Sequence, residues 1–121
     1  MDKTLKMSLL FDFYGPLLTK RQQDIFEMYF HDDLSLGEIS EQLDISRQDV
    51  YDMLKRSTQT LEDFEAKLGL VARHQQRQTT LEEITAQLST LSEDLKIGGR
   101  QDLAQRVEEL TAGVQELFSD S

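Results

Sequence analysis

The sequence predicts an all-α protein, and three observations support this fold class. The 121 residues include one proline and six glycines, so helix breakers are sparse. Apolar residues recur at spacings of three and four along most of the chain, whereas the alternating runs that are typical of strands are missing. At three places a Ser or Thr stands three positions before Gln, Glu or Asp where such a pattern begins, which is the signature of a capped helix start.

Four helices are predicted in the first part of the chain, at residues 3–13, 20–30, 36–43 and 47–68. Gly15-Pro16 ends the first helix. The other three begin at Thr19-x-x-Gln22, Ser35-x-x-Glu38 and Ser46-x-x-Asp49, where the hydroxyl oxygen is expected to accept a hydrogen bond from a first-turn amide. The fourth helix is expected to end at Lys67-Leu68-Gly69, because glycine readily adopts the left-handed conformation that follows a helix.

The last third of the chain has a heptad pattern. Apolar residues spaced three and four apart form two sets, which are Leu81, Ile84, Leu88, Leu91, Leu95 and then Leu103, Val107, Leu110, Val114, Leu117. Gly98-Gly99 separates the sets, so they predict either an antiparallel hairpin or part of a dimer seam. Each set spans about two heptads, which is too short for a stable isolated helix, and both are therefore expected to pack on something. The polar stretch 73–77, which includes His74, is expected to be a solvated linker, with RNA contact as an alternative.

These patterns divide the chain into a helix-turn-helix domain, residues 1–70, and a helical extension, residues 71–121. Lys and Arg number 13 and Asp and Glu number 23, so the net charge is −10. An acidic chain repels phosphate backbones at long range, and any nucleic-acid binding must therefore rest on a local patch. The chain has no cysteine, no apolar run of the roughly 20 residues that a membrane helix needs, and no secretory signal at its start. We expect a cytoplasmic protein without membrane insertion.

Residues 35–54 have the pattern of a helix-turn-helix motif. Ile39 and Leu43 face inward from the first helix, and Ile45 fills the turn. The second helix turns its own apolar residues toward them, namely Val50, Met53 and Leu54. Two helices that cross at a large angle require this arrangement. The first turn of the second helix would then meet base edges in a major groove.

The outward face of this second helix carries the candidate nucleic-acid-binding residues, which are Arg47, Gln48, Tyr51, Lys55 and Arg56. Arg and Gln side chains can read guanine and adenine edges, Lys and Arg can contact phosphates, and a tyrosine can stack on a base. The same face carries Asp49 and Asp52, and residues 19–60 hold five basic and nine acidic side chains. An ordinary solvated face, with Tyr51 in helix packing, is the alternative interpretation.

Residues 17–60 resemble region 4 of bacterial sigma factors, in which a helix opening like Leu18-Thr19 precedes the same motif. The turn glycine usual in that family is Asp44 here, and Asp tolerates the left-handed conformation. A more specific resemblance, through about residue 70, is to the YlxM-like family of Gram-positive bacteria. The strings that carry it are Lys6-Met-Ser-Leu-Leu-Phe-Asp-Phe-Tyr-Gly-Pro-Leu-Leu-Thr19, Asp32-Asp-Leu-Ser-Leu-Gly-Glu-Ile39 and Ser46-Arg-Gln-Asp-Val-Tyr-Asp52.

The YlxM-like resemblance implies a DNA-binding or regulatory protein. Members are encoded beside the signal recognition particle protein, so it also implies a role in that targeting pathway. No catalytic constellation and no cofactor motif is predicted. A metal site at His31, Asp32 and Asp33 is not predicted either, because adjacent residues cannot easily converge on one ion. Two hypotheses follow. The first is a nucleic-acid-binding regulator that dimerises through its C-terminal helices and places two recognition helices ~34 Å apart. The second is an acidic protein–protein adaptor that keeps the fold without binding DNA and takes a basic partner, such as a signal recognition particle component.

Overall fold

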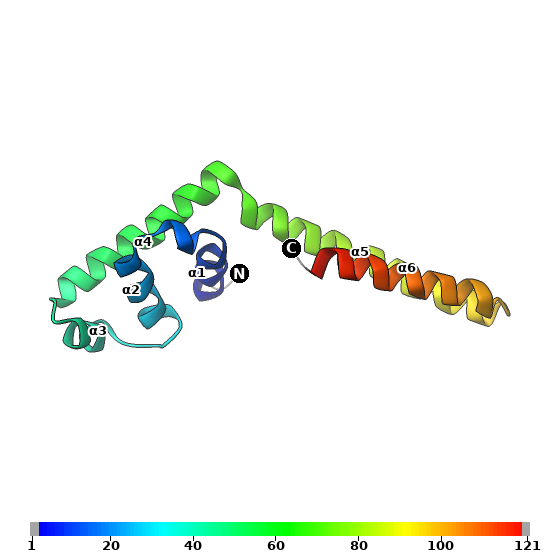
Figure 1. The fold of residues 1–121 in the computed structure, drawn as a ribbon, viewed down its shortest axis with the longest axis horizontal. Coiled ribbons are helices and arrows are strands. Elements are labelled where there is room, and N and C mark those ends of the chain that lie inside the picture. Colours follow the sequence, from blue (N-terminus) through cyan, green and yellow to red (C-terminus); the bar gives the residue numbers. More distant parts are fainter. Residues whose placement is uncertain (1–2, 120–121) are drawn as a thin grey trace. The chain divides into compact units, whose positions relative to one another are not determined.

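The computed structural model describes residues 3–119, and all regular structure in this part of the chain is helical (Figure 1). The elements are α1 (Lys3–Tyr14), the 3-10 turn η1 (Gly15–Leu17), α2 (Lys20–Phe30), α3 (Leu36–Leu43), α4 (Arg47–Leu68), α5 (Leu70–Ile97) and α6 (Gln101–Ser119). The all-α prediction is confirmed. The chain forms two compact units, residues 1–72 (unit 1) and residues 73–121 (unit 2).

The predicted helix starts are confirmed by their hydrogen bonds. Thr19 and Ser35 form complete capping boxes, in which the hydroxyl oxygen accepts from the third helical amide and the Gln22 or Glu38 side chain accepts from the cap amide. Ser46 accepts from the backbone amide of Asp49 at 3.0 Å, so the hydroxyl cap forms at this start without the return bond from the third-residue side chain that completes the other two boxes. These bonds satisfy first-turn amides that have no partner within their helices.

Two left-handed residues end helices α3 and α4. Asp44 has φ 55° and follows α3, and Gly69 has φ 63° and follows α4. Asp44 therefore adopts the left-handed conformation that glycine takes most readily, at a modest steric cost. The turn between α3 and α4 forms with an aspartate in this position.

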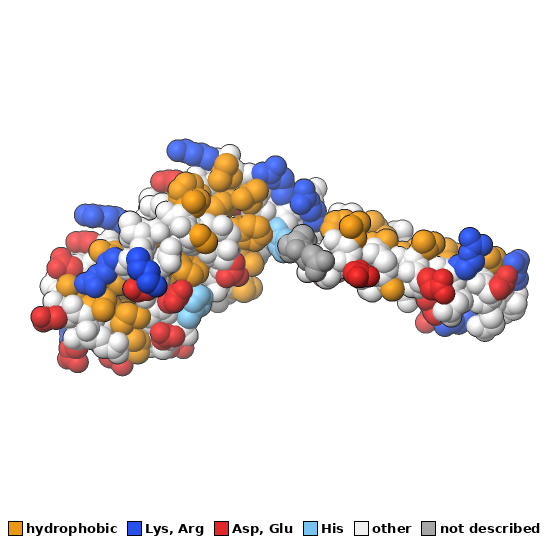
Figure 2. All heavy atoms as spheres, viewed as in Figure 1, with side chains coloured by type: hydrophobic (Ala, Val, Ile, Leu, Met, Phe, Trp, Pro, Cys, Tyr) orange, Lys and Arg blue, Asp and Glu red, His pale blue; other side chains and the backbone are white. Residues whose placement is uncertain are grey.

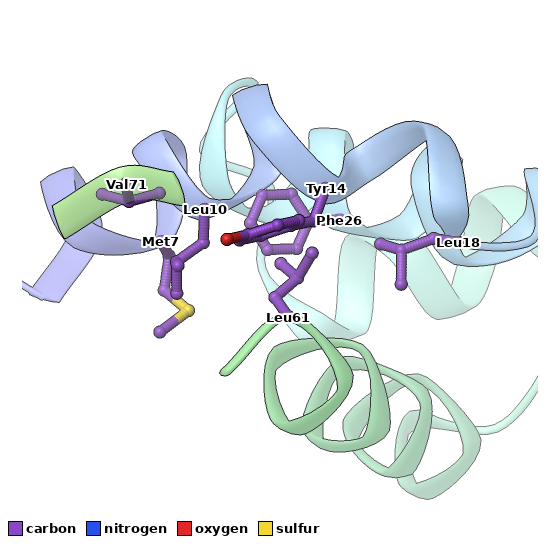
Figure 3. Close-up of a cluster of buried hydrophobic side chains, with 7 residues drawn as sticks. All are labelled: Met7, Leu10, Tyr14, Leu18, Phe26, Leu61 and Val71. Carbon is purple, nitrogen blue, oxygen red and sulfur yellow. The ribbon is translucent and has the colours of Figure 1, made fainter. Parts of the chain in front are cut away.

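The first core of unit 1 joins α1, α2 and α4 with the first turn of α5. Its buried residues are Met7, Leu10, Tyr14, Leu18, Phe26, Leu61 and Val71. Figure 3 shows these side chains converging, with Leu61 pointing from α4 toward the Tyr14 and Phe26 rings. Phe11 adds a stacked contact to Phe26, with ring centroids 4.5 Å apart. This core fixes the C-terminal half of α4.

The second core of unit 1 holds the helix-turn-helix motif. Ile25, Ile39, Val50 and Leu54 are buried, and partly buried residues pack around them, including Leu43, Ile45 and Met53. Every apolar residue that the sequence assigned to the motif thus lies in or against this core. The core holds α3 against the N-terminal half of α4 and so positions the outward face of α4.

Unit 2 is an antiparallel hairpin of α5 and α6, as one of the two predicted alternatives proposed (Figure 1). Gly99 has φ 79° in the turn, and the Arg100 amide donates to the Leu95 carbonyl at 2.7 Å. Across the hairpin, Glu108 accepts from Ser92 at 3.1 Å and pairs with Lys96 at 2.6 Å. The hairpin therefore has a polar edge that ties its two helices together.

Two predictions about the last third of the chain are wrong. Residues 73–77 are not a linker, because α5 begins at Leu70 and includes half-buried His74. The heptad seam also lies one position away from the predicted one. Thr85 and Ser92 take the inner positions on α5, whereas Ile84 and Leu91 are exposed.

Candidate nucleic-acid interface

The five predicted site residues are all exposed on the N-terminal half of α4. The buried row of this helix is Val50, Leu54, Ser57 and Leu61. At about 100° per residue, Gln48, Asp52 and Lys55 lie opposite this row. Arg47 and Tyr51 flank them toward α3, and Arg56 lies on the other flank. The structure therefore places the five residues over a broad face, with an aspartate in its centre.

Arg47 lies against the start of α3. A Cβ atom placed on Gly37 would be 3.0 Å from Nη2 of Arg47. The guanidinium thus occupies the space that a side chain at position 37 would need. Glycine at this position lets the arginine lie on the neighbouring helix, close to the first turn of α4.

Gln48 is already engaged within α4. Its side-chain amide donates to Oδ1 of Asp52 at 2.9 Å, a pair four residues apart on one helix face. Bidentate reading of an adenine by Gln48 requires this donor to exchange partners. Asp52 therefore competes directly with a base edge.

Tyr51 and Lys55 line an open groove of about 410 Å³ together with Lys3 of α1 and Tyr29 of α2. The groove joins two exposed aromatic rings with two ammonium groups. The prediction from sequence missed Lys3 and Tyr29, because residues 3 and 29 are far from position 51 along the chain. No local pattern marks them, and the packing of α1 and α2 brings them to α4.

Arg56 lines a second cavity, of about 240 Å³, with Arg21 of α2 and with Asp49 and Asp52 of α4. Arg21 is a further cation that the predicted site did not include. The two aspartates add negative charge to the same lining. Figure 2 shows blue and red side chains interspersed over the end of unit 1 that holds α3 and the start of α4. The interface is a mosaic of both charges with cations at its two flanks.

His31 does not share a metal cluster with its acidic neighbours. Its Nε2 atom lies 3.2 Å from the Ser8 hydroxyl oxygen, and its ring meets Phe11 and Phe26 edge-on. Within residues 3–119, no group of three His, Cys, Asp or Glu side chains is placed to hold a metal ion. Over the same residues, every helix is too short or too polar to cross a bilayer.

Comparison with known proteins assigns the chain to a family. Residues 1–98 match the family model described as "Putative helix-turn-helix protein, YlxM / p13 like". The chain belongs to the UPF0122 family. A UPF0122 protein of Thermoanaerobacter sp. strain X514 is 49% identical over 116 residues, which cover 96% of this chain and 97% of the relative. The family assignment agrees with the YlxM-like resemblance of the sequence.

Two further UPF0122 relatives match a shorter stretch of the chain. One, from Caldanaerobacter subterraneus subsp. tengcongensis, is 60% identical over 83 residues, which cover 69% of this chain and 71% of the relative. The other, from Listeria innocua, is 47% identical over 88 residues, which cover 73% and 80%. The UPF0122 family model spans all of unit 1, including the helix-turn-helix, and α6 lies beyond the matched residues. Its description is that of a helix-turn-helix protein.

Proposed function

We propose that this UPF0122 chain is a non-enzymatic, cytoplasmic regulatory protein that binds DNA through α4. The observation that carries the proposal is the exposed face of α4, held by α3 across a formed helix-turn-helix turn. A helix supported in this way can enter a major groove with its first turn toward the bases. The backbone then needs no rearrangement to present Arg47 and Gln48, and only the Gln48 side chain has to exchange its Asp52 partner.

In this proposal each side chain makes the kind of contact with nucleic acid that its chemical groups allow. Arg47 and Gln48 read base edges, because their donors match guanine and adenine in the major groove. Lys55 and Arg56 contact phosphates, and Lys3 and Arg21 extend these contacts on either side of α4. Tyr51 stacks on or packs against the nucleic acid. Asp49 and Asp52 weaken sequence-independent attraction, so that binding depends on the correct base contacts.

We also place the chain in the signal recognition particle pathway, as the YlxM-like resemblance implies. The particle's RNA and protein are then candidate partners alongside DNA. RNA in helical form presents a deep, narrow major groove that side chains read poorly. Binding to that RNA would therefore rest on phosphate contacts and unpaired bases, and the groove formed by Tyr29, Tyr51, Lys3 and Lys55 suits both.

A fluorescence-anisotropy titration tests the proposal. Labelled random duplex DNA and signal recognition particle RNA are titrated with the chain at about 50 mM and about 200 mM salt, because phosphate contacts lose affinity steeply over this range. Arg47→Ala is expected to cost about 1–3 kcal/mol, and Lys55→Ala and Arg56→Ala to lower the salt dependence by about one unit each. Lys67→Ala is the matched control, since it removes a cation from the far end of the same helix. Unchanged affinity in all three variants, or no binding to either nucleic acid, would refute the proposed interface.

The second candidate function is that of an acidic protein–protein adaptor. The observation that favours it is the placement of Asp52 in the middle of the same face, with Asp49 in the cavity beside it, together with the net charge of −10. A basic protein partner complements such a face. Replacing both aspartates by lysine should abolish capture of the partner if it is an adaptor, and should strengthen DNA binding if it is a DNA-binding protein. The two candidates therefore predict opposite outcomes for one variant.

We propose further that two copies of the chain pair through unit 2. A dimer would offer two α4 helices to the two half-sites of a symmetric DNA site, with an expected spacing of ~34 Å.

A further inference from the structure

The hairpin of unit 2 leaves several of the apolar residues of its heptad pattern exposed. The inner positions of α5 are half-buried or buried, and these are Leu81, Thr85, Leu88, Ser92 and Leu95. The inner positions of α6 follow the same spacing and are Ala104, Val107, Thr111, Val114 and Phe118. Besides Ile97 at the turn, four large apolar residues remain outside, with exposed fractions of 42% for Ile84, 47% for Leu91, 66% for Leu110 and 74% for Leu117. We call these four residues the apolar stripe.

The apolar stripe lies on one side of the hairpin. At about 100° per residue, Ile84 and Leu91 are rotated by about 70° from the inner row of α5, and Leu110 and Leu117 by about 85° from the inner row of α6. Because the helices are antiparallel, these rotations carry both pairs to the same side. The ion pair of Lys96 and Glu108 holds the opposite side. One face of the hairpin is therefore polar and the other apolar.

A hairpin of two helices cannot bury this face by itself. Between residues 73 and 119, the only fully buried side chains are Ser92 and Ala104, both small. Helices of this kind reach a stable packing when a second layer covers their apolar side, as in four-helix bundles. Hydrophobic atoms spaced along the visible face of unit 2 appear in Figure 2. The stripe has the length and spacing of a helix-packing seam.

We propose that the apolar stripe binds the stripe of a second copy of this chain, so that two hairpins form a four-helix bundle. This inference deepens the proposed pairing and names its surface. A twofold axis along the helices sets α5 of each copy opposite α6 of the other. Both stripes then interdigitate, because each contributes two residues per helix at a spacing of seven. Such an interface is the same patch on both copies, as a twofold dimer requires.

Charge complementarity favours a second copy over a different partner. Arg106 lies next to the stripe on α6, and Asp94 lies about one turn after Leu91 on α5. Glu108 meets Ser92 across the hairpin, so Arg106, two residues nearer the turn, is level with Asp94. Because the proposed twofold axis is parallel to the helices, Arg106 of one copy stays at the same height along the bundle as Asp94 of the other copy and faces it. The chain therefore supplies both members of the flanking ion pairs.

Gly113 gives independent support for close packing at this face. It lies between Leu110 and Leu117 on the same side of α6, and a Cβ atom placed there would meet nothing within 4 Å. The hairpin itself therefore gives no steric reason for a glycine, which weakens a helix relative to alanine. A partner helix packed on the stripe supplies one, because glycine lets two helix backbones approach closely.

Light scattering of the full chain across a concentration series tests the proposal. The wild-type chain is expected to show twice its 14.0 kDa mass at tens of micromolar. Leu91→Lys with Leu117→Lys is expected to be monomeric. Thr90→Lys with Gln105→Lys is the matched control, because it adds the same two charges on exposed positions away from the stripe, and it should stay dimeric. A monomeric wild-type chain, or a stripe variant as dimeric as its control, would overturn the proposal.

Two further variants distinguish loss of the dimer from loss of the folded hairpin. Gly113→Leu raises helix propensity and fills the approach surface, so it should weaken the dimer by about tenfold or more while circular dichroism shows full helicity. Asp94→Arg should weaken the dimer, and adding Arg106→Asp should restore it. If neither variant changes the dissociation constant, the stripe is not the interface. Mass is measured without nucleic acid, so failure here is distinct from failure of DNA binding.

Discussion

The Tyr14 hydroxyl donates a hydrogen bond of 2.6 Å to Oε1 of Glu65. The same carboxylate accepts the backbone amides of Val71 and Ala72, each at 3.0 Å, and the Leu70 amide donates to the Tyr14 oxygen at 3.1 Å. The pair therefore satisfies three amides of the first turn of α5, which have no acceptor within their helix. A carboxylate from α4 and a phenol from α1 together replace the side-chain cap that α5 lacks.

Removing the Glu65 carboxylate is expected to destabilise unit 1. Glu65→Ala removes the acceptor of three hydrogen bonds, two of them part-buried, and hydrogen bonds to a charged group are worth about 1.5–3 kcal/mol. The free energy of unfolding, from urea titration followed by circular dichroism, should fall by roughly that amount. Asp63→Ala is the control, because Asp63 is an exposed carboxylate on the same helix that accepts a hydrogen bond from the exposed Gln59 side chain at 3.0 Å. Equal losses in both variants would contradict the role of Glu65.

The buried hydroxyl of Ser57 is expected to cost stability. Its Oγ atom is fully buried in α4 and has no hydrogen-bond partner. Ser57→Ala removes an unsatisfied polar atom and raises helix propensity, so the free energy of unfolding should rise by about 1 kcal/mol. Thr58→Ala, on the next, partly exposed position, should change it much less. A thermal midpoint lower than that of the wild-type chain would show that the Ser57 hydroxyl is satisfied in solution.

Asp44→Gly is expected to stabilise the helix-turn-helix turn. Asp44 holds φ 55°, where an L-residue pays up to about 1–2 kcal/mol and glycine does not. Asp44→Val should destabilise the same turn, since a β-branched side chain tolerates this region least. Differential scanning calorimetry of the two variants measures both signs. A stabilising valine would show that the turn opens in solution.

Gly37→Ala is expected to separate stability from DNA binding. Alanine favours the α3 helix by up to about 1 kcal/mol, and its Cβ atom would displace only the flexible end of Arg47. The thermal midpoint should therefore be unchanged or higher. If Arg47 reads a base from its place against α3, affinity for DNA should fall several-fold. Lower stability with unchanged affinity would contradict the proposed placement.

The polar edge of the hairpin is expected to make unit 2 sensitive to pH. The hydrogen bond from Lys96, and then that from Ser92, hold the pKa of Glu108 below its ordinary value of 4.5. Glu108 likewise raises the pKa of Lys96 above 10.5. The carboxylate therefore stabilises the hairpin above pH 4.5, and this contribution is lost as the pH falls through the lowered pKa. The ammonium contributes below pH 10.5, and its contribution is lost as the pH rises through the raised pKa.

The pH dependence of hairpin unfolding checks this expectation. The midpoint of thermal unfolding, followed by circular dichroism, should be highest between these two limits. Glu108→Gln should flatten both limbs, because each of them depends on the same pair. Glu109→Gln, a neighbouring carboxamide substitution, should leave both limbs in place. A Glu108→Gln profile identical to that of the wild-type chain would show that the pair carries no stability.

The sequence by itself determined the local structure of this protein. Caps at Thr19, Ser35 and Ser46 and the stop at Gly69 depend on atoms a few residues apart, and the apolar spacing of the helix-turn-helix depends only on helix geometry. These features could be predicted because hydrogen bonds within one turn set where a helix begins. The predicted binding residues on α4 are likewise exposed because the opposite face is apolar.

Only the tertiary structure decided which residues from distant segments meet. Lys3 and Tyr29 lie beside Tyr51 because α1 and α2 pack on α4. Helix α5 begins at Leu70, earlier than predicted, because Tyr14 and Glu65 accept hydrogen bonds from the amides of its first turn. The heptads of the last third permit two seams one position apart, since Leu81, Leu88 and Leu95 belong to both. In the structure the two helices pack along the seam that buries Ser92 and Ala104. The residues of the other seam remain exposed, namely Ile84, Leu91, Leu110 and Leu117.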